Sequence, residues 1–166
     1  MVGAIILAVA MQSGYDPAEL LAVAYTESRW KHDAIGPRES VGVLQINCKA
    51  WWKHFGYVSE SACRSVLSTN THMNIAASMY ILRRYRKRYK RCSGDEVFAC
   101  YNGGPNWRKL GDRARRRVQA YRSQVVTRRA LIRPLLGGPI ADVWKALRDH
   151  ERSNGSLQPQ LQRPRK

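Results

Sequence analysis

The clearest folding signal in the chain is a helix start at residues 16–19. Asp16 is a typical N-cap, Pro17 fits the first turn, and Glu19 follows three residues after the cap. Apolar residues then recur at spacings of three and four as far as Trp30, which indicates a helix with one buried face. Similar spacing recurs along the chain, so the expected fold class is mainly α.

Caps, spacing and glycine stops place the other expected helices. They are predicted at residues 2–12, 48–55, 71–91, 95–101, 114–125 and 139–150. Thr71 is expected to cap the helix that it begins. Residues 31–47 are interrupted by Gly36-Pro37 and Gly42, so this stretch is predicted to be a loop or a small hairpin.

The chain of 166 residues fits a single domain, which we expect at 1–150. Residues 151–166 are rich in Gln, Pro and Arg and are expected to form a disordered basic tail. The apolar run at 1–11 is shorter than the roughly 20 residues of a membrane span. It also lacks the basic start of a signal peptide, so we expect neither a span nor a standard export signal.

The charge of the chain is high and uneven. Its 29 Lys and Arg residues outnumber 12 Asp and Glu residues, which gives a formal net charge of +17. Residues 1–82 hold 6 basic and 6 acidic residues, whereas 83–133 hold 17 basic and 3 acidic. This excess predicts an acidic partner, which could be nucleic acid, an anionic membrane or a bacterial envelope.

The cysteines indicate disulfides rather than a metal site. Cys48, Cys63, Cys92 and Cys100 lack the CxxC spacing of zinc sites, and the four histidines show no metal spacing. The 48–63 and 92–100 pairings need the least chain reach and would suit an extracytoplasmic protein. Three connectivities and buried free thiols all stay open. No metal or other cofactor is expected.

Glu27 is the candidate for acid–base chemistry. It lies at the end of the apolar face formed by Leu20, Val23 and Ala24, and the glycine-containing loop follows it. A carboxyl partly withdrawn from water holds its proton more tightly. A general acid that protonates a glycosidic oxygen needs that property.

Four blocks of sequence, taken in order, point to a family. They are Glu27-Ser28-Arg29-Trp30 with the Ala34-Ile35-Gly36 and Ser-Val-Gly-Val-Leu-Gln-Ile-Asn (40–47) segments, Asn74-Ile75, Tyr80-Ile81-Leu82, and Ala-Cys-Tyr-Asn-Gly-Gly-Pro at 99–105. Together they resemble the lytic transglycosylases of the lysozyme superfamily, over roughly residues 2–125. The resemblance implies a lysozyme-like helical domain with a small loop or hairpin segment beside the active-site cleft.

The resemblance also implies a reaction. Family members cleave the β-1,4 bond between N-acetylmuramic acid and N-acetylglucosamine in peptidoglycan, and usually leave a 1,6-anhydro-muramyl product. Glu27 would act first as acid and then as base, and Tyr101 would orient or hydrogen-bond its carboxyl. Ser40, Gln45, Asn47 and Asn102 would contact the sugars, or else make structural hydrogen bonds within the loop.

Two departures from the family pattern leave the mechanism open. Cys100 replaces a small alanine, and Glu39 stands where a glycine is common. Glu39 or Asp33 could activate water, which would make the protein a hydrolytic muramidase acting on the same bond. Trp30, Trp51 and Trp52 could stack on sugars, although such residues more often pack.

Rival classes rest on the basic run at 83–91, in which tyrosines are interleaved. A nucleic-acid-binding protein is the main alternative, but no recognition motif is visible, so no nucleic-acid partner is expected. A cationic membrane-disrupting protein is another alternative. The expected partners are peptidoglycan strands and, through residues 83–133, anionic envelope polymers. We expect a monomer that acts in the periplasm or cell wall of a bacterial target. The expected setting is a phage lysis or virion-associated enzyme, and the alternative is a conjugation or secretion apparatus.

Overall fold

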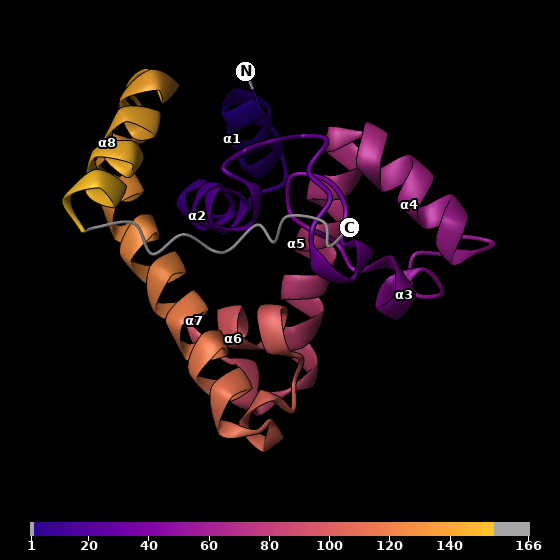
Figure 1. Ribbon diagram of the computed structural model, residues 1–166. Helices are drawn as coiled ribbons and strands as arrows, with labels where there is room; N and C mark the ends of the chain where they lie inside the picture. Colours follow the sequence, from indigo (N-terminus) through magenta and orange to yellow (C-terminus); the bar gives the residue numbers. More distant parts are fainter. Residues whose placement is uncertain (1, 155–166) are drawn as a thin grey trace, which may run out of the picture.

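The computed structural model describes residues 2–154, and these form a helical domain (Figure 1). The helices are α1 (Val2–Gln12), α2 (Pro17–Ser28), α3 (Cys48–Trp51), α4 (Glu60–Thr69), α5 (Thr71–Arg88), α6 (Glu96–Gly103), α7 (Asp112–Ile132) and α8 (Ile140–Ser153). Short 3-10 turns lie at Pro37–Glu39, Lys90–Cys92, Trp107–Lys109 and Arg133–Leu135. The prediction of a mainly α, lysozyme-like fold is confirmed.

Helix α2 is the most deeply buried element. Its start follows the sequence signal, because the Asp16 carboxylate accepts hydrogen bonds from the backbone N–H groups of Ala18 and Glu19. Every residue from 18 to 26 is buried, and α1 and α7 pack against the helix. Figure 1 shows α2 almost end-on between these neighbours. The residue that follows this buried stretch is Glu27.

Residues 48–71, which follow the predicted loop at 31–47, differ from the sequence prediction. Helix α4 was not predicted, although Ser59 caps it by accepting a hydrogen bond from Ala62 N–H. Asn70, rather than Thr71, caps α5. Of the helix predicted at 48–55, only the single turn α3 forms, and residues 52–56 are non-helical turns. A signal for α4 was present, because Ala62, Cys63, Val66 and Leu67 recur at helical spacing after the Ser59 cap.

Two disulfides connect these elements. Cys48 in α3 bonds to Cys63 in α4, and Cys92 bonds to Cys100 in α6. Of the connectivities that the sequence left open, the structure therefore has the one with the shortest loops. The second bond fixes α6 to the turn that follows α5.

Helix α8 closes the described part of the chain and packs on α7 and α2. Trp144 lies 5.4 Å from Tyr25 and 5.3 Å from Trp30, measured between ring centroids. The helix runs to Ser153, so it passes the boundary predicted at residue 150. The tail predicted at 151–166 falls mostly outside the described residues. Within residues 2–154, no helix has both the length and the apolarity needed to cross a membrane.

Candidate active site

Glu27 lies one residue before the end of α2 and keeps part of its surface exposed. Its Oε1 accepts a 2.7 Å hydrogen bond from the hydroxyl of Tyr121 in α7. Burial raises the pKa of the Glu27 carboxyl from 4.5 to about 7, and the hydrogen bond from Tyr121 opposes part of that rise. Near neutral pH, both the acid and the carboxylate are therefore populated, as a group that first gives and then takes a proton requires.

Tyr121 was not predicted to be a site residue. It falls within the helix expected at 114–125, at helical spacing from Val118 and Val125. A signal was present, because a tyrosine on the buried face of a helix needs a partner for its hydroxyl. The sequence does not say which of the distant polar groups that partner is.

Tyr101 differs from expectation. Its hydroxyl donates a 2.7 Å hydrogen bond to the backbone oxygen of Leu44, and the carboxyl of Glu27 is instead bonded by Tyr121. Burial, and then the nearby charge of Glu27, raise the pKa of Tyr101 well above its ordinary value. Tyr101 thus belongs to the surroundings of Glu27, but its hydrogen bond fixes the glycine loop.

The loop at 41–46 is held from several elements. The hydroxyl of Ser28, next to Glu27, donates a 2.8 Å hydrogen bond to Val43 O. The fully buried side chain of Asn74 in α5 accepts from Leu44 N–H at 2.9 Å and donates to Val41 O at 2.9 Å. Together with Tyr101, these bonds attach the loop to α2, α5 and α6. The Asn-Ile block of the sequence therefore has a structural role beside the site.

Two glycines permit this tight loop. Gly42 has φ of +76°, and a Cβ there would lie 2.2 Å from Nδ2 of Asn74. At Gly36 a Cβ would lie 1.8 Å from Oε1 of Gln45. Any larger residue at either position would displace the side chains that hold the loop.

The four residues expected to contact sugars divide into two pairs. Gln45 donates to Ala34 O at 2.9 Å and to Gly42 O at 2.8 Å, and Ser40 donates to Pro37 O at 3.2 Å. These two side chains make the structural loop bonds that were the alternative expectation.

Asn47 and Asn102 form the second pair and are differently placed. The Oδ1 atom of Asn47 is buried and has no hydrogen-bond partner among the described residues. Asn102 lies exposed near the end of α6. Because the Asn47 oxygen is closed to solvent, Asn102 is the one of the two whose side chain a ligand can reach.

The segment that follows Glu27 in the sequence contains strained backbone conformations. Non-glycine residues with left-handed backbone occur only between positions 29 and 45 of the described chain, at Arg29, Trp30, Arg38, Glu39 and Gln45. Such conformations persist where the surrounding contacts impose them, and they cluster at functional sites. The residues with left-handed backbone therefore lie within 29–45, a segment that includes most of the hydrogen-bonded loop at 41–46.

The two other carboxyls considered for the reaction are placed differently from Glu27. The side chains of Glu39 and Asp33 are 66% and 76% exposed, and Glu39 forms an ion pair with Arg64 in α4. Residues 2–154 contain no group of three or more His, Cys, Asp or Glu side chains placed to hold a metal ion.

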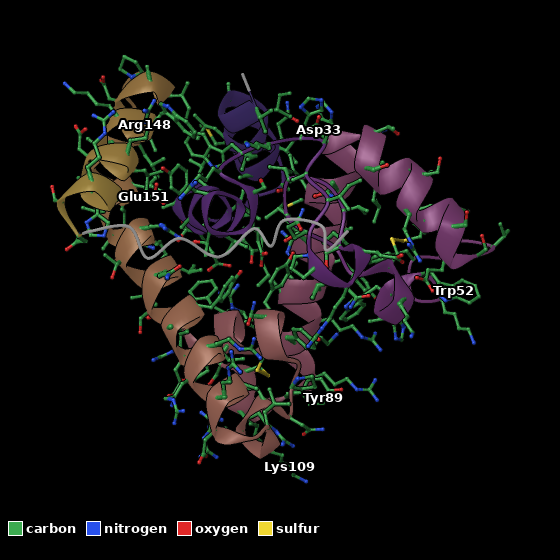
Figure 2. All side chains as sticks on the ribbon, in the orientation of Figure 1. Asp33, Trp52, Tyr89, Lys109, Arg148 and Glu151 are labelled. Carbon is green, nitrogen blue, oxygen red and sulfur yellow. A yellow bond between two sulfur atoms is a disulfide. The ribbon has the colours of Figure 1, made fainter. Side chains whose placement is uncertain are left out.

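Trp30 serves in packing. It is 8% exposed, and its ring nitrogen donates a 2.9 Å hydrogen bond to Leu21 O. Trp51 and Trp52 remain half-buried on and after α3, and Figure 2 shows Trp52 at the outer side of that region. Of the three tryptophans, these two are the ones that a ligand can reach.

A helical domain with a partly buried carboxyl of raised pKa at a helix end, beside a loop fixed by glycines and asparagine, is a lysozyme-like domain. The family model described as Transglycosylase SLT domain matches residues 4–122. The chain therefore belongs to this family of transglycosylases, which act on peptidoglycan. No curated protein and no solved structure matches it significantly. The matched region includes Glu27, Tyr101 and Tyr121 and ends before α8.

Proposed function

We propose that the protein is a lytic transglycosylase that cleaves the β-1,4 bond between N-acetylmuramic acid and N-acetylglucosamine, with Glu27 as general acid and base. The observation that carries this proposal is the Glu27 carboxyl, which has a pKa of about 7 and accepts a hydrogen bond from Tyr121. It is the one carboxyl that the folded site sets apart.

The protonated Glu27 gives its proton to the glycosidic oxygen, and the N-acetylglucosamine side leaves as an alcohol. The acetamido group of the substrate stabilises the cation at the anomeric carbon, so a second protein carboxylate is not required. The Glu27 carboxylate then removes the proton of the muramyl 6-hydroxyl while that oxygen bonds to the anomeric carbon. The result is a 1,6-anhydro product and a reprotonated Glu27. During the ionised interval, the Tyr121 hydroxyl stabilises the negative charge on Oε1.

Mass analysis of the released muropeptides tests the reaction. We expect anhydro ends, which are lighter than reducing ends by one water. Glu27→Gln should lower turnover by about 10²- to 10⁴-fold, whereas the exposed Glu39→Gln should retain it. Reducing muramic acid ends together with loss of activity in Glu39→Gln would establish the hydrolytic alternative instead. Full activity of Glu27→Gln would overturn the assignment of Glu27.

The basic residues at 83–133 support a second part of the proposal: this region binds anionic polymers of the bacterial envelope. Arg113, Arg116 and Arg117 lie exposed on α7 and have no acidic partner among the described residues. Binding of Glu27→Gln to intact walls should weaken as salt rises, because exposed charges are screened. Salt-insensitive binding would reject electrostatic binding by this region and leave the catalytic proposal intact. Equally tight binding to a DNA duplex would favour the nucleic-acid alternative.

We further propose that the enzyme acts in the periplasm or cell wall of a bacterial target during phage lysis or entry. The strong positive charge supports this setting. The Gln-Ile-Asn sequence at 45–47 supports the alternative, a conjugation or secretion apparatus. The genes beside this one decide between them: lysis or virion genes would support the phage setting, and conjugation or secretion genes would reject it.

A further inference from the structure

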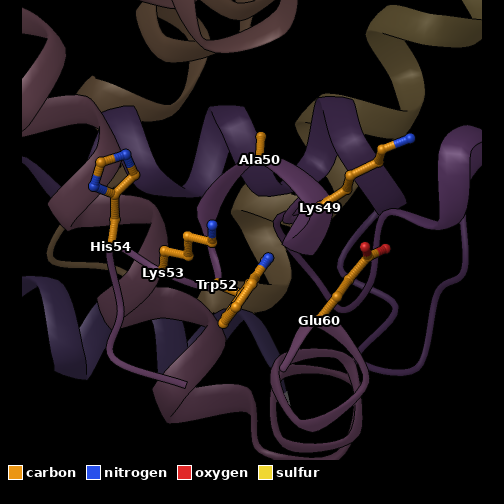
Figure 3. Close-up of a pocket in the computed structure, with 6 residues that line it drawn as sticks. All are labelled: Lys49, Ala50, Trp52, Lys53, His54 and Glu60. Atoms are coloured by element: carbon orange, nitrogen blue, oxygen red, sulfur yellow. The ribbon is translucent and has the colours of Figure 1, made fainter. Parts of the chain in front are cut away.

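A hollow of about 290 Å³ lies between α3 and the C-terminal part of α5. Its walls include Trp51, Arg84, Tyr85, Arg88, Tyr89 and Pro105. A second hollow of about 490 Å³ shares Ala50 and His54 with the first. Figure 3 shows the second hollow, with Lys49, Lys53 and Trp52 around it.

The first hollow lies next to the candidate active site. Pro105 belongs to the turn that directly follows α6, the helix that carries Tyr101. On the other wall, Trp51 belongs to α3, which directly follows the loop at 41–46. A ligand in the hollow would therefore contact the segments that directly follow the loop and the helix of Tyr101.

The charge in this hollow is not neutralised by the protein. Arg84 and Arg88 lie one helical turn apart, and neither has a carboxylate partner within the described chain. Arg84 donates only to the hydroxyl of Tyr80, at 3.2 Å. By contrast, Arg86 between them turns inward and pairs with the buried Glu19 at 2.6 Å. The helix thus pairs one arginine with a buried acid and leaves the other two at the hollow.

Aromatic rings form the floor between these arginines. The ring centroids of Trp51 and Tyr85 are 5.6 Å apart, and those of Tyr85 and Tyr89 are 6.0 Å apart. The guanidinium of Arg88 lies 6.0 Å from the centroid of the Tyr89 ring. Such a surface holds an alkyl or peptide segment, and the guanidinium groups bind carboxylates well because their planar geometry matches.

We propose that this hollow binds a carboxylate of the peptide stem that each glycan strand carries. The inference rests on the proposed function. The sugars of the strand bear no free charge where the stem is attached, so a cationic hollow beside the sugar cleft suits the stem better than another sugar. An envelope phosphate polymer is the less favoured ligand, because the hollow is lined by segments that adjoin the loop and the helix of Tyr101, to which the glycan must bind.

The test is a binding titration in the Glu27→Gln background, at about 0.15 M salt so that distant charges are screened. One probe is a glycan oligomer with intact stems, and the other is the same oligomer with its stem carboxylates methyl-esterified. The variant is R84Q/R88Q. The matched control is K145Q/R148Q, which removes the same charge from exposed positions on α8. Figure 2 shows Arg148 and Tyr89 at well-separated parts of the molecule.

We expect R84Q/R88Q to weaken binding of the acidic oligomer by about tenfold or more, and esterification to weaken wild-type binding by a similar factor. The variant should bind the esterified oligomer as the parent does, and the control should bind both probes as the parent does. Equal losses with both probes would show a sugar contact. Equal losses in variant and control would show general attraction. Either of these results, or no loss at all, overturns the proposal.

Release of anhydro products by the otherwise unchanged enzyme is measured in parallel. Its absence would refute the proposed function, whereas its presence with no stem preference would refute only the stem site. Thermal melting of R84Q/R88Q checks that the variant is folded.

Discussion

The hydroxyl of Tyr121 donates a 2.7 Å hydrogen bond to Oε1 of Glu27, and this bond joins α7 to the end of α2. Two opposing effects act on the same carboxyl: burial raises its pKa, and the hydrogen bond lowers it, for a net value of about 7. Tyr121 is therefore a positioning residue that also adjusts the proton affinity of the acid.

Tyr121→Phe removes this donor while keeping the ring. Because the hydrogen bond favours the carboxylate, its loss should raise the pKa of Glu27 and move the alkaline limb of the kcat–pH profile upward, by roughly half to one unit. The kcat value should fall about tenfold, since the ionised state loses support. The measurement is a pH series of muropeptide release. An unchanged limb would show that Tyr121 only packs.

Tyr101→Phe is the matched comparison, because its hydroxyl bonds Leu44 O instead of Glu27. This variant should leave the alkaline limb in place and lower the free energy of unfolding by about 1–2 kcal/mol, since the buried Leu44 oxygen loses its partner. A shift of the limb as large as that of Tyr121→Phe would contradict the different roles assigned to the two tyrosines.

The sequence was a good guide wherever local signals decide the structure. The cap at Asp16, the stripe that ends at Glu27 and the glycine stops of the loop all depend on neighbours within a few residues, and they predicted α2 and the loop correctly. Tyr121 could not be assigned because its partner is 94 residues away. Gln45 was open between sugar contact and loop support, since only the folded loop shows that its amide is occupied.

The raised pKa of Glu27 predicts a pH-dependent cost to stability. The unfolded carboxyl ionises near pH 4.5, and the folded one near pH 7. Between these values the folded state retains a proton that the unfolded state has lost, so this cost is absent below pH 4.5, grows through the window and is complete above pH 7. Glu27→Gln removes it.

We expect Glu27→Gln to match the stability of the wild type at pH 4 and to exceed it by about 1–3 kcal/mol at pH 8. Urea unfolding at several pH values measures the difference. The exposed Glu39→Gln serves as control, and should change stability by less than about 1 kcal/mol without growth across the window. A Glu27→Gln protein that is less stable at pH 8 than at pH 4, relative to wild type, would reject the buried acid.

Asn74→Leu tests the support of the loop. The substitution removes the side-chain hydrogen bonds to Val41, Leu44 and Leu67 and leaves their backbone groups buried without partners. We expect a loss of about 2–4 kcal/mol in the free energy of unfolding, and a larger loss of activity than of helix content. Circular dichroism together with muropeptide release measures both. Full activity in a folded Asn74→Leu protein would show that the loop does not need this anchor.

The last prediction concerns α8, which lies outside the region matched by the family and yet reaches the helix that carries Glu27. Arg128 in α7 is 6% exposed, donates to Thr26 at 2.8 Å and pairs with Glu151 of α8 at 3.0 Å. Glu151 also pairs with Arg29 at 3.4 Å and accepts from the hydroxyl of Tyr25 at 3.2 Å. This carboxylate therefore connects α8 to the last turns of α2.

Glu151→Leu leaves Arg128 in the interior without an opposing charge, so it should lower the free energy of unfolding by roughly 2–4 kcal/mol. Replacing both residues, as Arg128→Met with Glu151→Leu, should cost clearly less than the sum of the single changes, because no buried charge is left unpaired. Urea unfolding of the two single variants and the double variant measures this coupling. Simple additivity would show that α8 is held by the packing of Trp144 alone. Strong coupling would instead make the ion pair part of the support beneath Glu27, and would place the C-terminal helix within the working domain.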